Sequence, residues 1–211
     1  MAKVSGLGQA LFVQGFDLST DTSSVDNLGY TQELLDTTAI DQTCYSRIIG
    51  RTDSTLTVNG WFDNADDKSH EAYTVSNKLP TGDRAVTYLL GTAIGETALI
   101  LNAKQANYDV TNSPGNALAT TASFSSTASV SGFDGMEFGV MLDAGATTYT
   151  STTNGTTVDQ SASSASGSVA CLQFVSGVSV SSLVAKIQHS SDGGSWSDII
   201  TFSTISANTP T

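Results

Sequence analysis

Apolar and polar residues alternate with a period of two along most of this chain. In "STLTVNGWF", Leu56 and Val58 alternate with Thr55, Thr57 and Asn59. Successive side chains of a β-strand point to opposite faces, so this pattern predicts strands with one face in a core and one outside it. Similar patterns occur in "ALFVQGF", "AVTYLL", "TALILNAK", "GMEFGVMLD", "SVACLQFV", "SLVAKIQH" and "DIITFSTI". The sequence therefore predicts an all-β fold, mainly an antiparallel sandwich or barrel.

One stretch departs from this pattern and predicts a short α-helix at about 65–79. Asn64 is a suitable N-cap, acidic residues follow it, and Pro80 and Gly82 end the segment. The run "DNADDKSHE" is then the solvated start of a helix. A calcium loop is the alternative, but the run lacks the residue order of an EF-hand.

The length of 211 residues suits a single β domain spanning 1–211, although two small domains would also fit. A Ser/Thr/Gly-rich stretch at about 144–168 interrupts the strand patterns, and its Asn154-Gly155 pair is typical of a hairpin turn. In a monomer such a stretch is expected to be a mobile loop. In an assembly it is expected to be an arm that orders against a neighbour.

Charge and cysteine usage exclude several classes of function. The chain has 20 acidic and 8 basic residues, and the bases are scattered, so ordinary DNA binding is not expected. No run is long enough for a membrane span or a secretory signal, which predicts a soluble chain made in a cytoplasm. Cys44 and Cys171 match no metal spacing, and a disulfide between them stays open.

The stretch "KIQHSSDGGSWSDIITF" contains the residue types of a hydrolase triad. His189, Ser190 and Asp192 are nearly consecutive, however, whereas known triads combine distant parts of a chain. Asp and Gly in "SDGG" favour a strand reversal, so a β-hairpin turn is the better interpretation. The sequence offers no other catalytic set. We therefore expect no enzyme, no catalytic residue, no metal site and no cofactor.

Two further stretches resemble a known family. "LLDTTAIDQTCYSRIIGRTDSTLTVNGWFDN" has an acidic turn, an alternating strand and a "GWFD" end, and "TTVDQSASSASGSVACLQFVSG" leads on to "VAKIQHSSDGGSWSDIITF". With the opening "GQALFVQGFDLS", these stretches resemble the major tail (tail tube) proteins of long-tailed, siphovirus-type bacteriophages, in matching order over half to two thirds of the chain. The family pattern continues with another strand or two after the final hairpin, whereas this chain stops at "TISANTPT".

The resemblance implies a structural virion protein rather than an enzyme. Such subunits stack as rings, hexameric in the family, into a conduit for DNA ejection, with tape-measure and tail-tip proteins as further partners. An acidic lining would keep DNA from adhering to the wall, although plain solubility is an alternative reason for the acidity. The expected intersubunit sheet face comprises Thr55, Thr57, Asn59 and Trp61, and the candidate channel acids are Asp17, Asp21, Glu33, Asp36, Asp41, Asp53 and Glu137.

Two other classes of function stay open. A carbohydrate-binding or adhesive β-sandwich on a virion surface would use exposed aromatic residues such as Trp61, Tyr149 and Trp196. A capsid decoration or tail-completion subunit would share the composition of a tube protein. Rings or polymers are expected of a tube subunit, and glycan binding by a monomer or trimer is expected of an adhesin.

Overall fold

The fold is almost entirely antiparallel β-structure, as the alternation predicted. A computed structural model describes residues 8–128, 135–143, 147–159, 167–175, 180 and 182–206. Its elements are β1 (Ala10–Val13), β2 (Phe16–Asp17), β3 (Thr22–Asp36), β4 (Arg47–Trp61), α1 (Ser69–Tyr73), β5 (Arg84–Leu89), β6 (Thr97–Thr111), β7 (Ala119–Ser126), β8 (Met136–Val140), β9 (Lys186–His189) and β10 (Ser197–Thr201).

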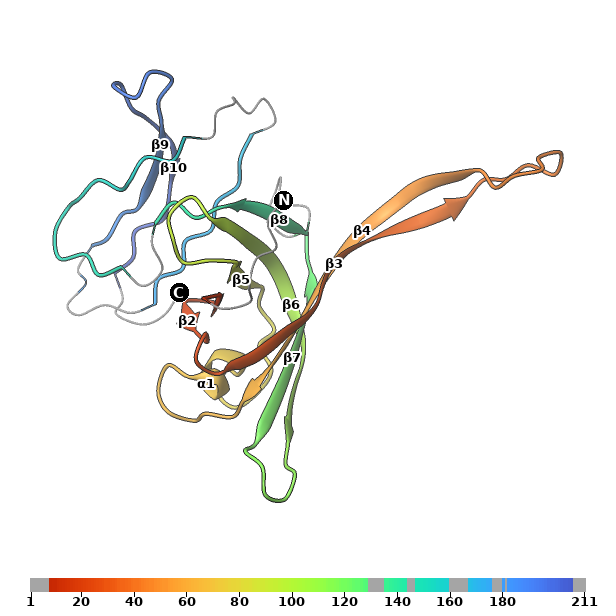
Figure 1. The fold of residues 1–211 in the computed structure, drawn as a ribbon, viewed down its shortest axis with the longest axis horizontal. Helices are drawn as coiled ribbons and strands as arrows, with labels where there is room; N and C mark the ends of the chain where they lie inside the picture. Colours follow the sequence, from red (N-terminus) through yellow and green to blue (C-terminus); the bar gives the residue numbers. More distant parts are fainter. Residues whose placement is uncertain are drawn as a thin grey trace.

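Eight of the strands form one curved sheet that wraps around the main core (Figure 1). The strand order is β2-β1-β5-β6-β7-β4-β3, and β8 pairs with β6. Register places apolar residues opposite one another, for example Leu56 with Phe124 and Val86 with Leu101. All four side chains are at most 1% exposed. Burial of such side chains supplies most of the favourable free energy of folding.

The segment predicted as one strand, "ALFVQGF", is instead two short strands joined by a tight turn. Gln14 and Gly15 both have positive φ angles, 51° and 83°, which reverse the chain between β1 and β2. Left-handed conformations at two successive residues are those of a type I′ hairpin turn. The alternation of apolar residues alone did not indicate this reversal.

The helix is much shorter than predicted. α1 comprises five residues, Ser69–Tyr73, rather than the whole of 65–79, and its N-cap is Lys68 rather than Asn64. Asp67, just before the cap, has a φ of 61°, which no right-handed helix accommodates. After the helix, Ser76 and Asn77 also have positive φ angles.

Polar side chains from a turn and two strands bind backbone groups at both ends of α1. Asp21 accepts a hydrogen bond from the Ser69 amide through Oδ2 at 3.2 Å. At the other end, Arg84 donates to the Ala72 carbonyl, and Gln105 donates to the Tyr73 carbonyl. Helix ends leave backbone groups without intrahelical partners, which explains why these polar residues are buried beside the core.

The C-terminal part packs against the outer side of the sheet. Gln173 accepts a hydrogen bond from the Gly15 amide at 2.6 Å and donates to Thr87 Oγ1 at 3.0 Å. The described residues of "SVACLQFV" pair in no ladder, so the strand predicted there is not found. A small second core of Phe12, Leu89 and their neighbours lies on this side, with Val175 packed against it. β9 and β10 form a separate two-stranded hairpin.

Candidate assembly surfaces

The outer face of β4 and its neighbours is lined with small polar side chains. Leu56 and Val58 point into the core, so Thr55, Thr57 and Asn59 point outward by the two-residue period. Strand pairing then places the polar residues of β3, β6 and β7 on the same surface. We name this surface the polar sheet face; it comprises Ser24, Asp26, Asp53, Thr55, Thr57, Asn59, Asn107, Asp109, Thr121, Ser123 and Ser125.

Hydrogen bonds connect the polar sheet face from strand to strand. Asn59 donates to Asp26 Oδ2 at 2.6 Å and accepts from Thr121 Oγ1 at 2.9 Å. Asn107 accepts from the Ser123 amide at 2.8 Å and donates to Asp109 at 2.6 Å. These bonds hold carboxylates and carboxamides in fixed positions across four strands. The result is a rigid, hydrated surface with a negative charge.

A two-stranded arm extends away from the rest of the molecule (Figure 1). We name the arm as residues 30–53, comprising the outer parts of β3 and β4 and the loop at 37–46. β4 pairs with β7 only from Thr55 onward, so no third strand of the described chain pairs with the arm. Its exposed apolar residues are Tyr30, Leu34, Leu35, Ile40, Tyr45, Ile48 and Ile49, and Ile40 is fully exposed.

Such an arm is an unusual feature for a protein that works as a monomer. A two-stranded hairpin in water is marginally stable because it has no second layer to cover its side chains. Contiguous exposed apolar residues commonly mark a protein interaction site. The arm therefore has the composition of a surface that is buried in an assembly.

Local hydrogen bonds order the loop at the end of the arm. Asp36 accepts hydrogen bonds from the amide and the hydroxyl of Thr38, at 2.9 and 2.5 Å, and these bonds lower the pKa of Asp36. The Ser46 amide donates to Thr38 Oγ1 at 2.9 Å. Arg47 lies 4.8 Å from the centre of the Tyr45 ring, close enough for a cation–π contact. The loop thus presents a defined shape.

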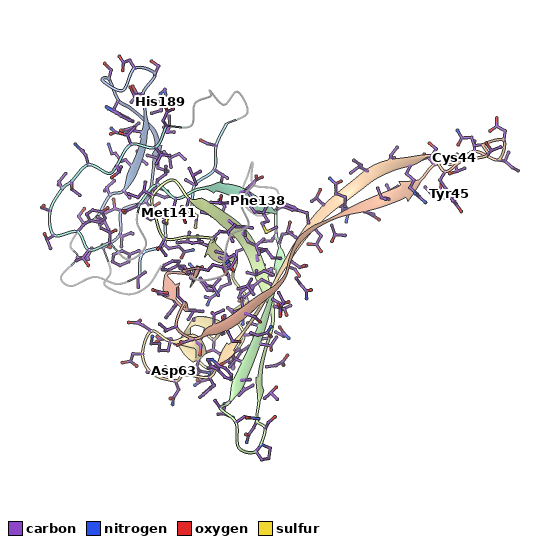
Figure 2. The ribbon with its side chains drawn as sticks, viewed as in Figure 1. Cys44, Tyr45, Asp63, Phe138, Met141 and His189 are labelled. Carbon is purple, nitrogen blue, oxygen red and sulfur yellow. The ribbon has the colours of Figure 1, made fainter. Side chains whose placement is uncertain are left out.

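An aromatic pair lies at the base of the arm. The rings of Tyr30 and Phe138 are 6.1 Å apart, and Phe138 is 57% exposed (Figure 2). The Tyr30 hydroxyl donates to the Met136 carbonyl, which links the arm to β8. Burial, with a smaller contribution from nearby Glu137, raises the pKa of Tyr30.

The seven candidate channel acids do not lie on one surface. Glu33, Asp36 and Asp41 belong to the arm, and Asp53 lies on the polar sheet face. Asp21 is only 8% exposed and caps α1, so it is an interior residue rather than a surface acid.

The remaining two candidates lie apart from these. Asp17 accepts hydrogen bonds from the amide and hydroxyl of Ser19 in the turn after β2, and Glu137 is on β8. Asp26 and Asp109, which the sequence did not single out, belong to the polar sheet face. Their positions follow from strand register, which the sequence alone does not supply.

The residues of the possible triad form a hairpin turn. Ser190 donates to Asp192 Oδ1 at 2.8 Å, and the same oxygen accepts the amides of Gly194 and Ser195 at 2.8 and 2.9 Å. These bonds lower the pKa of Asp192 to about 2. The carboxylate therefore stabilises the turn between β9 and β10, where His189 is exposed (Figure 2).

Other predicted features have the following positions. Trp61 is exposed at the end of β4, and Tyr149 and Trp196 are exposed outside the strands. The aromatic contacts found in the described part of the chain involve other residues. Cys44 and Cys171 are free thiols.

Within the described ranges no cluster of three potential metal ligands occurs, and no helix is both long and apolar enough to cross a bilayer.

Part of the Ser/Thr/Gly-rich stretch lies outside the described residues, namely 144–146 and 160–166. Residues 147–159 are almost all exposed and form no strand, so the hairpin predicted at Asn154-Gly155 is not found. The Tyr149 hydroxyl donates a hydrogen bond to Asp143 Oδ1 at 2.6 Å.

Comparison with known proteins gives structural likeness only. No protein-family model and no curated protein matches the sequence. One solved structure, titled as the virion of a native gene transfer agent particle, has a TM-score of 0.49 and 10% identity over 65% of this chain and 99% of that chain. A sheath/tube terminator of an extracellular contractile injection system has a TM-score of 0.48 and 8% identity, over 65% of this chain and 98% of that one.

A third solved structure is the tail of an empty gene transfer agent particle. Its TM-score is 0.47, with 11% identity over 66% of this chain and 99% of that chain. With all of these scores below 0.5, the likeness carries no argument about function.

Proposed function

We propose that this protein is a structural subunit of a virion tail, and that it assembles with copies of itself into stacked rings forming a tube. The observation that carries the proposal is the arm, whose exposed apolar residues have no partner layer within the described chain. The sequence resemblance to major tail proteins supports the same function. In the proposal the rings are hexameric, and tape-measure and tail-tip proteins complete the tail.

The polar sheet face is the proposed lining of the channel. Duplex DNA carries about one negative charge per 1.7 Å of its axis, so a basic wall would form many phosphate contacts that each moving segment must break. Asp26, Asp53 and Asp109 instead give this face a negative charge, and hydroxyls and carboxamides keep it hydrated. With a Debye length of about 8 Å in physiological salt, the repulsion acts close to the wall and leaves passage open.

The hydrogen bonds within the polar sheet face also favour sliding of the DNA. Asn59, Thr121 and Asn107 each donate a hydrogen bond to a neighbouring side chain, which leaves fewer donors for phosphate oxygens. A surface with few free donors offers weak and short-lived contacts to a polyanion. The channel lining would thus be inert through both its charge and its satisfied hydrogen bonds.

Electron microscopy of the purified protein at rising concentration tests the proposal. We expect stacked rings with a central hole, and a monomer at all concentrations and inside its parent particle would contradict it. A decoration or tail-completion subunit would instead appear on the capsid surface or as a single ring. Trp61 and Trp196 make no aromatic contact in the described part of the chain, so no aromatic platform there favours the glycan-binding alternative.

Lysine substitutions test the channel lining separately. In assembled particles, Asp26→Lys and Asp109→Lys should slow DNA ejection, and Asp143→Lys, outside the polar sheet face, should not. Unchanged ejection in both lining variants would show that this face does not contact the DNA.

A further inference from the structure

The guanidinium of Arg84 is buried and has no anionic partner among the residues that the structure describes. Its side chain belongs to a residue only 7% exposed, and its one hydrogen-bond acceptor is the Ala72 carbonyl. Arg84 Nε has no hydrogen-bond partner, and the two ion pairs found in the described ranges involve Lys104 and Lys186 instead. Burial lowers the pKa of Arg84, but a guanidinium stays protonated at neutral pH.

The hydrogen bond to the end of α1 uses only part of the donor capacity of the Arg84 guanidinium. One N–H suffices for the Ala72 carbonyl, and a guanidinium has five donors arranged to bind a carboxylate through two of them. A buried charge without a counter-charge is costly, and such groups are usually paired. Arg84 therefore has unused capacity to bind an anion.

A pocket leads to this group from the surface. Its lining includes Arg84, Phe16, His70 and Glu71, and Val75 at its edge is 53% exposed. Glu71 is the acid in the lining, and its Oε2 accepts a hydrogen bond from the Asp67 amide at 2.9 Å. The pocket lining thus combines apolar side chains with the Arg84 cation and one acid, Glu71. Its complement is an apolar side chain next to a free carboxylate.

The loop at the end of the arm presents that combination. Ile40 is fully exposed, and Asp41 beside it has no hydrogen-bond or ion-pair partner in the described part of the chain. Asp36, the other acid of this region, is already bound to Thr38. The arm points away from α1 in the same protomer, so the loop reaches this pocket only on another copy (Figures 1 and 2).

We propose that the arm of one subunit inserts Ile40 and Asp41 into the pocket of a second copy of this chain, where Asp41 pairs with Arg84. The proposal rests on the proposed function, since it names the surface that receives the arm during assembly. It also explains why an acidic chain keeps a buried, unpaired arginine beside an open pocket.

Cross-linking tests the contact without requiring complete tubes. Cys44 lies three positions from Asp41 and is exposed, so it is a natural handle on the arm. In a Cys171→Ser background, Glu71→Cys places a second thiol in the pocket lining, and Ser197→Cys places a matched thiol on the distant β10. A short bis-maleimide should join copies of the Glu71→Cys variant, and those of Ser197→Cys at least about tenfold less.

Charge changes test the pairing itself. Asp41→Lys should raise the concentration needed for assembly about tenfold or more, the scale of losing one partner of a close charge pair. Glu33→Gln, a charge change elsewhere on the arm, should leave it within about twofold. Arg84→Asp combined with Asp41→Arg should restore part of the loss, and thermal unfolding identifies any variant that fails to fold.

The outcomes separate this proposal from the proposed function. Cross-links through Glu71→Cys without rings would support the contact and contradict the tube. Rings that form without these cross-links, and that tolerate Asp41→Lys, would overturn the contact and leave the tube proposal intact.

Discussion

A single strand, β4, passes through two environments that differ in everything except backbone pairing with β3. In the body, Leu56 is fully buried between β3 and β7. In the arm, Ile49 of the same strand is 64% exposed and faces no second layer. Both halves pair with β3, but apolar and polar residues alternate in the body, whereas Ile48 and Ile49 are adjacent in the arm. The difference is burial. The body part of β4 stabilises the protomer, whereas the exposed arm part is available to stabilise an association between copies.

The largest difference is expected between two phenylalanines. Phe124 is 1% exposed in the core, so Phe124→Ala should lower the free energy of unfolding by about 3–5 kcal/mol. Phe138→Ala removes the same side chain from the exposed base of the arm and should cost less than about 1 kcal/mol. Urea denaturation of both variants measures the contrast, and equal losses would contradict it.

A smaller effect is expected at Gly60, where β4 contacts the turn after β2. A Cβ at this position would overlap the Asp21 carbonyl oxygen, a backbone atom that cannot easily move aside. Gly60→Ala should therefore cost about 1–3 kcal/mol, whereas Gly139→Ala meets open space and should be nearly neutral. Thermal unfolding of the two variants tests this, and a neutral Gly60→Ala would show that the turn yields.

The polar sheet face should contribute less than the core. Asn59→Ala removes the hydrogen bonds to Asp26 and Thr121 and should cost about 1 kcal/mol. Thr52→Ala, on the exposed arm portion of β4, is the control and should change stability by less than about 0.5 kcal/mol. Chemical denaturation distinguishes the two; a larger loss at Thr52 would mean that the arm is not independent of the body.

On the arm, stability and association should separate. Ile40→Ser should change the free energy of unfolding of the monomer by less than about 0.5 kcal/mol, because the side chain is fully exposed. The same change should weaken self-association, which sedimentation velocity over a concentration series measures. Unaltered association would remove the apolar end of the arm from the interface.

The smallest effect concerns the other two-stranded element, the β9–β10 hairpin. The pKa of Asp192 is lowered to about 2 from an unfolded value near 3.9, so the unfolded turn binds the proton more tightly. The stabilisation is present above pH 4 and is lost as the pH falls through about 2. The amide NMR shifts of Gly194 and Ser195 should titrate with that midpoint, and Asp192→Asn should abolish the titration.

Much of the fold was predictable because alternation reports directly on burial in a sheet. The faces of β4 were predicted residue by residue, and the turn at Asp192 followed from its Asp-Gly chemistry. Alternation is a local signal, however, and in the arm part of β4 it gives way to adjacent apolar residues, Ile48 and Ile49. The stretch "RIIGRTD" does not indicate whether a third strand pairs with it, because that pairing depends on where β7 ends.

The helix and the pocket were less predictable for a related reason. The propensities of 65–79 favour a helix, but left-handed residues at Asp67, Ser76 and Asn77 confine it to one turn and a half. Partners of α1 come from Asp21, Arg84 and Gln105, which are far apart in the chain. Asp21 appeared to be a surface acid because a sequence does not show such distant partners.

The continuity of β3 and β4 from body to arm has a mechanical consequence. Each strand is a single element of 15 residues, and the register irregularities of β3 at 26–29 and 32–34 do not end it. A pull on the arm is thus carried along the backbone into the β4–β7 ladder, which is loaded in shear. Many bonds then resist together, so in the proposed assembly tension between neighbouring subunits would be borne by the β4–β7 ladder of each.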